Sequence, residues 1–487
     1  MKINILILII LFGASLVSAQ PIKLLPENPH YFLFKGKAIA IISSSEHYGA
    51  VINPDFDYLK YLNTLKQDGM NYTRLFTGAY FEKMGSFGIE KNTLAPVSGE
   101  ALLPWKRSNI TGAIGGGNKF DLDQWNELYF NRLKDFISEA AARNIIVELT
   151  LFSSIYGYWD IQAWNPQNNI NIKETILQEN VQTLRNGSVL KYQERLVRKL
   201  VDELNGFDNV IYEIQNEPWA DHAVLVRKIS DYFNTDDLKF DYLKWRDIVE
   251  VADQQSLEWQ KRMAEVVKDE ENGLKNKHLI AQNYCNYFYP VSEVDPNVSI
   301  LNFHYAYPEV VSQNYGFNKV IGFDETGFSG NDDATYRKQA WRFMMMGGGL
   351  FNNLDYSFAV GFEDGKAVNK APGGGSAAFR QQIKVLSGFI HSFNLKELAP
   401  DGDVVILSPG AFAKALSVSG KQYAIYLENS SKCKLTLNLP KGHFLAEWVS
   451  TLNGKVVGSE ILKHKQGNIT LTSPEYDSDI ALKINKL

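Results

Sequence analysis

Cysteine is scarce in this chain of 487 residues, which contains only Cys285 and Cys433. Two cysteines cannot form the disulfide framework that holds many small exported domains together, so the fold must depend on a hydrophobic core. The hydrophobic share of 45% is sufficient for such a core. We expect both thiols to be unpaired; a single bridge between two domains is the alternative.

Long hydrophobic runs are also lacking, apart from one near the start. The segment Ile5–Phe12 follows Lys2 and precedes the small-residue ending Val17-Ser18-Ala19, a pattern typical of a cleavable secretory signal. This run is too short to span a bilayer, and no later stretch reaches about 18 uninterrupted apolar residues. We therefore expect residues 1–19 to be removed and the mature protein to be exported, either secreted or periplasmic, without stable membrane insertion. An uncleaved anchor is the alternative.

Neither sign of charge is in large excess. The net charge is −5, and lysine and arginine are scattered along the chain. The sequence therefore lacks the clustered positive charge that is typical of a nucleic-acid-binding protein. The motifs His-Glu-x-x-His, Gly-x-x-x-x-Gly-Lys-Ser/Thr and Gly-x-Ser-x-Gly are absent. The chain therefore lacks the signatures of zinc peptidases, P-loop proteins and α/β-hydrolases.

Between about residue 30 and residue 395, strand-like runs alternate with amphipathic helical patterns, as expected of a parallel sheet. Eight strands and their connecting helices predict an α/β fold, a (β/α)8 TIM barrel, over residues 20–394. The predicted strands are Lys37–Ile42, Asn71–Phe76, Ile145–Leu151, Val210–Ile214, Leu279–Ala281, Ile300–Phe303, Val320–Phe323 and Leu350–Leu354.

The helices between these strands have recognisable boundaries. Asn53-Pro54 is a start signal and Gly69 a stop signal for the first, whose apolar residues recur every three positions. Five more segments carry apolar residues at three- and four-residue spacing. They are Leu128–Arg143, Val189–Leu204, Leu243–Lys268, Thr335–Met346 and Phe379–Phe393.

Residues 395–487 have a different pattern, in which short β-rich runs are separated by turn residues. This pattern predicts a small all-β domain, a β-sandwich, packed in a fixed arrangement on the barrel. We expect it to brace the barrel; carbohydrate binding is the alternative. The predicted strands are Val404–Leu407, Ala413–Val418, Tyr423–Leu427, Leu435–Leu439, His443–Trp448 and Ile480–Ile484.

Two connections after predicted strands are unusually long, Thr77–Asp121 and Phe152–Val189. In a barrel these are active-site loops. Their aromatic residues are suited to stacking on sugars or, equally, to anchoring the loops themselves; they are Trp105, Tyr156, Tyr158, Trp159 and Trp164.

Two glutamates stand at the ends of short apolar runs, Glu217 after the fourth predicted strand and Glu325 after the seventh. Barrel enzymes carry their active-site groups at the carboxyl ends of the strands. Two facing carboxyl groups are what hydrolysis of a glycosidic bond requires. The pair therefore predicts a glycosidase site; two strand-end carboxylates held in salt bridges are the alternative.

These motifs resemble those of the clan A retaining glycoside hydrolases, a superfamily of barrel enzymes that includes cellulases and mannanases. Its members carry an Asn-Glu pair, usually followed by Pro, after strand four and a second Glu after strand seven. Here Asn216-Glu217-Pro218 and Glu325 match these positions. The resemblance implies that Glu217 is the general acid/base and Glu325 the nucleophile.

The resemblance also implies roles for neighbouring residues. Arg74, at the end of strand two, would steady the nucleophile, and Asn216 would donate to the 2-hydroxyl of the sugar. After strand six, His304 matches a site histidine, and either Tyr305 or Tyr307 would hydrogen-bond Glu325. Further candidates for substrate contacts are His47, Tyr48, Trp159 and Trp219.

The chain departs from the clan pattern after strand eight, where a tryptophan platform is common. The sequence here is Phe351–Phe358, so that Tyr356 is the candidate platform. Asp355 could contact a substrate hydroxyl or brace the loop.

Together these features predict a retaining β-glycosidase, specifically a β-glycanase, acting on a β-linked polysaccharide or oligosaccharide without a metal or organic cofactor. One alternative is a carbohydrate-binding barrel without turnover. Another is an inverting barrel hydrolase, whose carboxyl groups would be about 6.5 to 9.5 Å apart rather than about 5 to 5.5 Å. The sequence specifies neither the sugar nor the oligomeric state.

Overall fold

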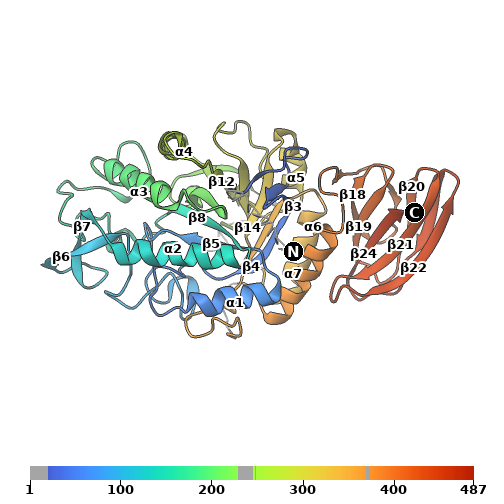
Figure 1. Ribbon diagram of the computed structural model, residues 1–487, viewed down its shortest axis with the longest axis horizontal. Coiled ribbons are helices and arrows are strands. Elements are labelled where there is room, and N and C mark those ends of the chain that lie inside the picture. Colours follow the sequence, from blue (N-terminus) through green and yellow to red (C-terminus); the bar gives the residue numbers. More distant parts are fainter. Residues whose placement is uncertain (1–19, 229–244, 247, 369–372) are drawn as a thin grey trace, which may run out of the picture.

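The computed structural model describes residues 20–228, 245–246, 248–368 and 373–487. A barrel and a smaller all-β domain lie side by side along the long axis of the molecule (Figure 1). In the described part of the chain, no helix is long and apolar enough to cross a membrane.

Eight parallel strands form a nearly closed barrel, which confirms the predicted fold class. Neighbouring strands are hydrogen-bonded in a single series from β4 to β5. In that series they are β4 (Ile41–Ser45), β15 (Leu350–Leu354), β14 (Val320–Glu325), β13 (Ile300–His304), β12 (Leu279–Asn286), β9 (Val210–Asn216), β8 (Ile146–Ser153) and β5 (Tyr72–Phe76).

Side chains join the two ends of this series. The amide of Asn71 accepts from the Ile42 backbone N–H at 3.0 Å and donates to the Ala40 carbonyl at 3.0 Å. The Ser43 hydroxyl donates to the Tyr72 carbonyl at 2.6 Å. These contacts hold β4 against β5 where the two strands come together.

The first predicted strand, residues 37–42, is wrong in its position. Lys37–Ile39 is β3, which pairs with β2 (Phe32–Phe34) in a small antiparallel sheet that also contains β1 (Lys23–Leu24). The barrel strand β4 lies further along and ends in three buried serines, whose polarity concealed it in the sequence.

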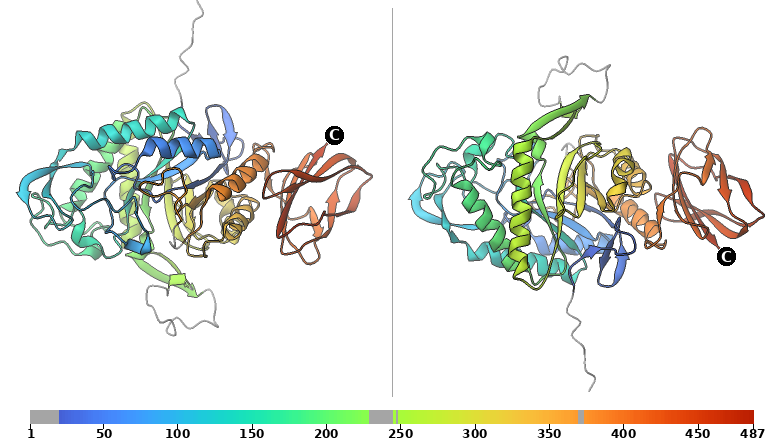
Figure 2. Two further views of the ribbon diagram at one scale, coloured as in Figure 1. Left: turned by 90° about the horizontal axis from the view of Figure 1, so that it is seen from below. Right: turned by 90° about the horizontal axis from the view of Figure 1, so that it is seen from above.

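Helices cover the outside of the barrel (Figures 1 and 2). The first, α1, begins later than Asn53-Pro54 because the Asp57 side chain caps it, and it ends as predicted at Gly69, which has φ 79°. The helices are α1 (Tyr58–Asp68), α2 (Glu127–Ala142), α3 (Val189–Leu204), α4 (Gln254–Asn272), α5 (Glu309–Asn314), α6 (Asp333–Met344) and α7 (Ala377–Ile390). Of these, α5 was not predicted.

The predicted helix Leu243–Lys268 is wrong in its first part. Ile248–Ala252 is a strand, β11, which pairs antiparallel with β10 (Ala223–Lys228); residues 243, 244 and 247 lie outside the described residues. Helix α4 starts only after Asp253, whose carboxylate accepts from the Ser256 N–H at 2.8 Å. The β-branched residues of β11 favour a strand, and its edge pairs with β12 at Cys285. Figure 2 shows the β10–β11 hairpin projecting from the barrel.

The C-terminal domain consists of two antiparallel sheets packed on a shared hydrophobic core, in agreement with the predicted sandwich. The larger sheet has the order β16 (Ala399–Pro400), β18 (Phe412–Val418), β19 (Gln422–Glu428), β24 (Asp479–Lys486), β21 (Gly442–Ser450) and β22 (Val456–His464). The smaller has β17 (Val405–Leu407), β20 (Lys434–Leu439) and β23 (Gly467–Thr472). The strands β22 and β23 were not predicted. Most residues of β22 are exposed, whereas in β23 the alternation of Ile469 and Leu471 with polar residues was a signal that the prediction missed.

Charged and aromatic contacts join the two domains. Arg337 of α6 donates to Asp479 of β24 at 2.7 Å, and both side chains are buried. The rings of Trp341 and Tyr426 stack with centroids 5.4 Å apart. Cys285 and Cys433 are buried and unpaired, as expected.

Candidate active site

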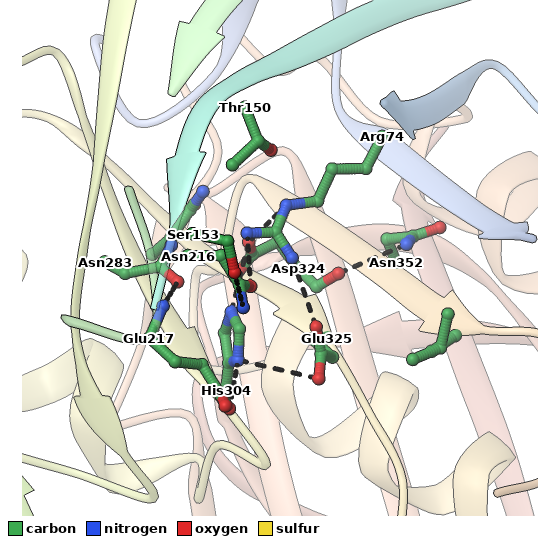
Figure 3. Close-up of polar contacts among 12 residues, drawn as sticks. Arg74, Thr150, Ser153, Asn216, Glu217, Asn283, His304, Asp324, Glu325 and Asn352 are labelled. Atoms are coloured by element: carbon green, nitrogen blue, oxygen red, sulfur yellow. Dashed lines mark hydrogen bonds and ion pairs between the residues drawn. The ribbon is translucent and has the colours of Figure 1, made fainter. Parts of the chain in front are cut away.

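Glu217 and Glu325 lie together at the carboxyl ends of the barrel strands (Figure 3). Glu325 is the last residue of β14, and Glu217 follows β9 in a left-handed conformation with φ 46°. This unfavourable backbone is held from both sides: the Glu217 N–H donates to Asn283 Oδ1 at 3.1 Å, and its carbonyl accepts from the Ser154 hydroxyl at 2.6 Å.

The two carboxyl groups are close. One oxygen of Glu217, one oxygen of Glu325 and a ring nitrogen of His304 all lie within 4.8 Å of one another. His304 lies between the glutamates, with Nδ1 2.8 Å from Glu217 Oε1 and 3.8 Å from Glu325 Oε1. The strand-end pair and the predicted site histidine are therefore brought together.

Glu325 is held by two donors. Arg74 Nη1 donates to Oε2 at 3.1 Å, and the Tyr305 hydroxyl donates to Oε1 at 2.9 Å. Of the two tyrosines considered from the sequence, only Tyr305 makes this contact. Tyr307 is 39% exposed and packs against the Phe288 ring.

Glu217 is held by a residue whose role the sequence did not indicate. The Tyr156 hydroxyl donates to Glu217 Oε2 at 2.7 Å and accepts from Asn216 Nδ2 at 2.7 Å. The side-chain oxygen Oδ1 of Asn216 in turn accepts from Arg74 Nη2 at 2.8 Å. Tyr156 and the following Gly157 both have positive φ, and the glycine was a signal of a tight turn.

Buried polar residues support the site from inside the barrel. Arg74 is fully buried and donates to Glu213 Oε2 through Nε at 2.8 Å, while its Nε lies 3.4 Å from Asp324 Oδ2. Glu213 also accepts from the Thr150 hydroxyl at 2.6 Å, and Glu148 accepts from Asn302 at 2.8 Å. Sequence analysis missed these acids, although a glutamate inside an apolar strand, as in Val210-Ile211-Tyr212-Glu213, is itself an unusual feature.

Among the residues that the structure describes, two clusters have the spacing of metal ligands, Glu217–His304–Glu325 and Glu148–Glu213–Asp324. The Arg74 guanidinium already ion-pairs with Glu213, Asp324 and Glu325. Burial raises the pKa of Glu148 well above its usual range, which favours its neutral form. The charges of the second cluster are thus largely compensated by the protein itself.

The pKa values of the site are coupled through His304. Burial lowers the pKa of His304, but the charges of Glu325 and Asp324 outweigh burial and raise it well above its usual range. Burial also works to raise the pKa of Glu217, but the hydrogen bond and charge of His304 outweigh it and lower this pKa. Burial raises the pKa of Glu325, and the charge of Glu217 adds to this effect.

These directions are the reverse of those that the resemblance implies, because they favour protonation of Glu325 over protonation of Glu217. The lowered pKa of Glu217 depends on a charged His304. When His304 is neutral, the charge that lowers the pKa of Glu217 is removed, while burial and the nearby Glu325 carboxylate still favour the protonated form of Glu217.

A cavity of about 630 Å³ opens above the pair. Its lining includes the predicted contact residues His47, Tyr48, Trp219 and Tyr356, and aromatic residues that were not predicted. The latter are Phe76, Tyr80, Phe87, Trp245 and Phe328.

Other predicted contacts lie elsewhere. Trp159 does not line this cavity; its indole N–H donates to the Ile176 carbonyl at 3.0 Å, so it anchors its own loop. Trp105 and Trp164 are buried against one another with ring centroids 4.4 Å apart. Asp355 is fully buried and pairs with Arg380 at 2.8 Å, which makes it a brace of the loop after β15.

No family model matches this sequence, and a search of curated proteins finds no significant relative. Solved structures match along nearly the whole chain. A glycoside hydrolase family 5 protein from Bacteroides vulgatus has a TM-score of 0.61 at 12% identity, covering 96% of this chain and 93% of its own. A putative glycoside hydrolase from Bacteroides vulgatus has a TM-score of 0.65 at 12% identity, with coverages of 97% and 83%.

A third structure, described as a glycoside hydrolase, has a TM-score of 0.61 at 11% identity, covering 96% of this chain and 97% of its own. At these identities the likeness concerns the fold, and it extends over both domains. The chain thus has the barrel-and-sandwich fold found in these glycoside hydrolases.

Proposed function

We propose that this protein is a retaining β-glycoside hydrolase. The observation that carries the proposal is the close approach of Glu217 and Glu325, with carboxylate oxygens within 4.8 Å, beneath an aromatic-lined cavity. Retaining enzymes place their two carboxyl groups about 5 to 5.5 Å apart, whereas inverting enzymes leave room for a water between them. The short separation favours retention over the inverting alternative.

In the first step, Glu325 attacks the anomeric carbon while Glu217 protonates the leaving oxygen, forming a glycosyl ester on Glu325. In the second step, Glu217 takes a proton from water, which displaces Glu325 with net retention. Arg74 and Tyr305 hold the Glu325 carboxylate in position for attack through hydrogen bonds of 3.1 and 2.9 Å.

The acid role requires that Glu217 carries a proton when substrate binds. In the free protein the raised pKa of His304 favours a charged imidazole, whose hydrogen bond and charge lower the pKa of Glu217. We therefore propose that His304 passes its proton to Glu217 across their 2.8 Å contact as substrate binds, which leaves His304 neutral. Once Glu325 is esterified, its negative charge is gone, the pKa of Glu217 falls, and Glu217 becomes suited to act as a base.

Asn216 and Tyr156 orient the acid. Arg74 fixes the carbonyl of the Asn216 amide, so that its NH2 group points toward Tyr156 and the cavity side of the pair. In the proposed complex this NH2 group donates to the 2-hydroxyl of the sugar, a contact that strengthens in the oxocarbenium-like transition state.

A neutral saccharide suits the charges of the cavity. Four carboxylates line it, Glu82, Glu217, Glu250 and Glu325, and no lysine or arginine stands among the described lining residues. The excess of carboxylates in this lining disfavours a uronic acid. The signal-like residues 1–19 support the further proposal that the enzyme acts outside the cytoplasm on β-linked polysaccharide or oligosaccharide.

The test is hydrolysis of a panel of β-linked polysaccharides and aryl β-glycosides by the mature protein, with Glu217→Ala, Glu325→Ala and a surface control, Glu179→Ala. We expect turnover by the wild type and the control, and loss of at least about 10³-fold in both site variants. Azide should restore Glu217→Ala on an activated substrate and yield the β-glycosyl azide. Glycan binding without turnover across the panel would replace this proposal by the carbohydrate-binding alternative.

A further inference from the structure

In the proposed reaction the sugar that is attacked lies on the Glu325 side of the cavity, so the walls on that side decide how much glycan fits beyond the cleaved bond. In the sheet, β14 is followed by β15, β4 and then β5 across the side-chain junction. The loops after these strands contribute Tyr356, His47 and Glu82 to the lining, and the rings of His47 and Tyr356 stack with centroids 6.1 Å apart. We call this region the glycone end.

Residues 89–94 close the glycone end; we call this segment the glycone wall. Ile89 and Leu94 line the cavity. Thr93 fastens the segment to the loop after β4: its hydroxyl donates to Glu46 Oε2 at 2.5 Å and accepts from the Gly49 N–H at 3.1 Å. The backbones meet so closely that a Cβ added at Gly49 would lie 2.1 Å from the Thr93 carbonyl carbon.

The glycone wall, which belongs to the loop after β5, is also tied to an earlier part of that loop and to the loop after β15. The Leu94 carbonyl accepts from the Glu82 N–H at 2.8 Å, in the loop after β5. The Lys91 carbonyl accepts from the Val360 N–H at 3.2 Å, in the loop after β15. Contacts to the loops after β4 and β15, and within its own loop, seal the wall against the barrel in the described part of the chain.

Glu82 is the carboxylate at this end, and it is 4% exposed. Its Oε1 accepts from the Tyr80 hydroxyl at 3.2 Å and lies 3.5 Å from His47 Nε2, and its Oε2 accepts from Asn92. A carboxylate offers about four acceptor positions, so one remains for a hydroxyl of a bound sugar. Its three neighbours fix the carboxylate in place.

We propose that the enzyme is exo-acting: Glu82 accepts a hydrogen bond from a hydroxyl of one terminal neutral sugar, and the glycone wall excludes any unit beyond it. This inference rests on the proposed glycosidase function. An enzyme that cleaves inside chains needs a groove open at both ends of the cleaved bond, whereas here the end on the Glu325 side is closed by hydrogen-bonded backbone. Because no further unit fits beyond this sugar, the ring edge that faces Glu82 must carry free hydroxyls. The bound sugar is therefore the non-reducing terminus of the glycan.

The test compares 4-nitrophenyl β-monosides with the matching β-biosides and follows the products from the matching oligosaccharides and polysaccharide. We expect nitrophenol from a monoside, release of single sugars from oligosaccharides, and no loss of polysaccharide viscosity. Rapid viscosity loss, or release of nitrophenol together with an intact disaccharide, would overturn the inference while leaving the proposed function intact.

Two variants locate the cause. Glu82→Gln should lower kcat/KM for the monoside at least tenfold, while Glu100→Gln, an exposed change in the same long loop but outside the wall, should leave it within twofold. Leu94→Ala should open the wall. The release of nitrophenol together with an intact disaccharide from the bioside should then rise at least fivefold relative to nitrophenol release from the monoside. Unchanged kinetics in Glu82→Gln would show that Glu82 does not bind the terminal sugar. An unchanged ratio of bioside to monoside turnover in Leu94→Ala would show that the wall does not limit the length of the glycan.

Binding to Glu217→Gln keeps the inference testable without turnover. Titration calorimetry with a monosaccharide iminosugar, whose cation binds beside Glu325 and so fixes the ring at the cleavage site, should show affinity that falls when one sugar is added to its non-reducing end. Affinity that rises with each added unit would indicate an open groove. Absence of both binding and turnover across the panel would instead overturn the proposed function itself.

Discussion

The Tyr156 hydroxyl lies 2.7 Å from Oε2 of Glu217 and donates to it, from a loop sixty-one positions earlier in the chain. Because this bond stabilises the ionised carboxylate, it contributes to the low pKa of Glu217. It also holds the side chain beside Asn216, where a glycosidic oxygen would bind. Tyr156 is therefore a positioning residue for the acid.

Tyr156→Phe removes this bond without changing the shape of the ring. A hydrogen bond to a charged group contributes about 1.5–3 kcal/mol, so we expect kcat/KM to fall about 10- to 150-fold. Loss of a donor to the carboxylate raises the pKa of Glu217, so the limb of the pH–rate profile that reports this group should move to higher pH. Tyr158→Phe, in the same loop, serves as the control and should change neither. A profile that keeps its shape would mean that Tyr156 acts only in packing.

Arg74→Lys should damage both activity and stability. Arg74 is fully buried and bonds Glu213, Asn216 and Glu325 at once, a fork that a lysine cannot reproduce. We expect a loss of about 3–5 kcal/mol in the free energy of unfolding, measured with urea, together with a large fall in kcat. Arg185→Lys, on an exposed turn, is the matched control. Full stability of Arg74→Lys would contradict the role of this network in holding the barrel interior.

Glu46→Gln should alter the pH dependence of stability. Burial raises the pKa of Glu46 to about 7 in the folded protein, against about 4.3 for an unfolded glutamate. Between these values the folded state binds more protons than the unfolded state, so this group makes stability fall as the pH rises from about 4 to about 7. Glutamine is never charged and still accepts from Thr93. The free energy of unfolding of the variant should therefore rise by up to about 3 kcal/mol relative to that of the wild type as the pH increases from 5 to 8. If urea unfolding gave the same difference in free energy of unfolding between the two proteins at pH 5 and at pH 8, the raised pKa of Glu46 would be refuted.

Asp479→Ala should weaken the junction of the two domains. It leaves the buried Arg337 guanidinium without the carboxylate that it contacts at 2.7 Å. Unpairing a buried charge costs about 3–5 kcal/mol, and we expect thermal unfolding of the barrel and sandwich to separate into two transitions. Asp477→Ala, two residues away and exposed, should unfold as the wild type does. A single unchanged transition in Asp479→Ala would show that the domains are joined mainly by apolar contacts such as that of Trp341 with Tyr426.

Local patterns were most informative where a strand is buried on both sides. Seven of the eight barrel strands were found within a few residues, because their apolar runs end at turn residues. The exceptions were informative. The predicted first strand ended before the serines of β4, although each of their hydroxyls has a buried partner. The residues of β11 were predicted as helix because their apolar spacing suits either structure until Asp253 caps α4.

The sequence by itself determined the alternation of strands and helices, the all-β tail, and the placement of Glu217 and Glu325 at strand ends. These follow from near neighbours along the chain, since periodicity and turn residues act over a few positions. Only the tertiary structure decided which loop residues reach the pair. Tyr156 bonds Glu217 whereas Trp159 anchors its loop, and Thr93 closes one end of the cavity through contacts with Gly49 and Glu46. Such choices depend on the path of long loops, which is set by contacts between residues far apart in the chain.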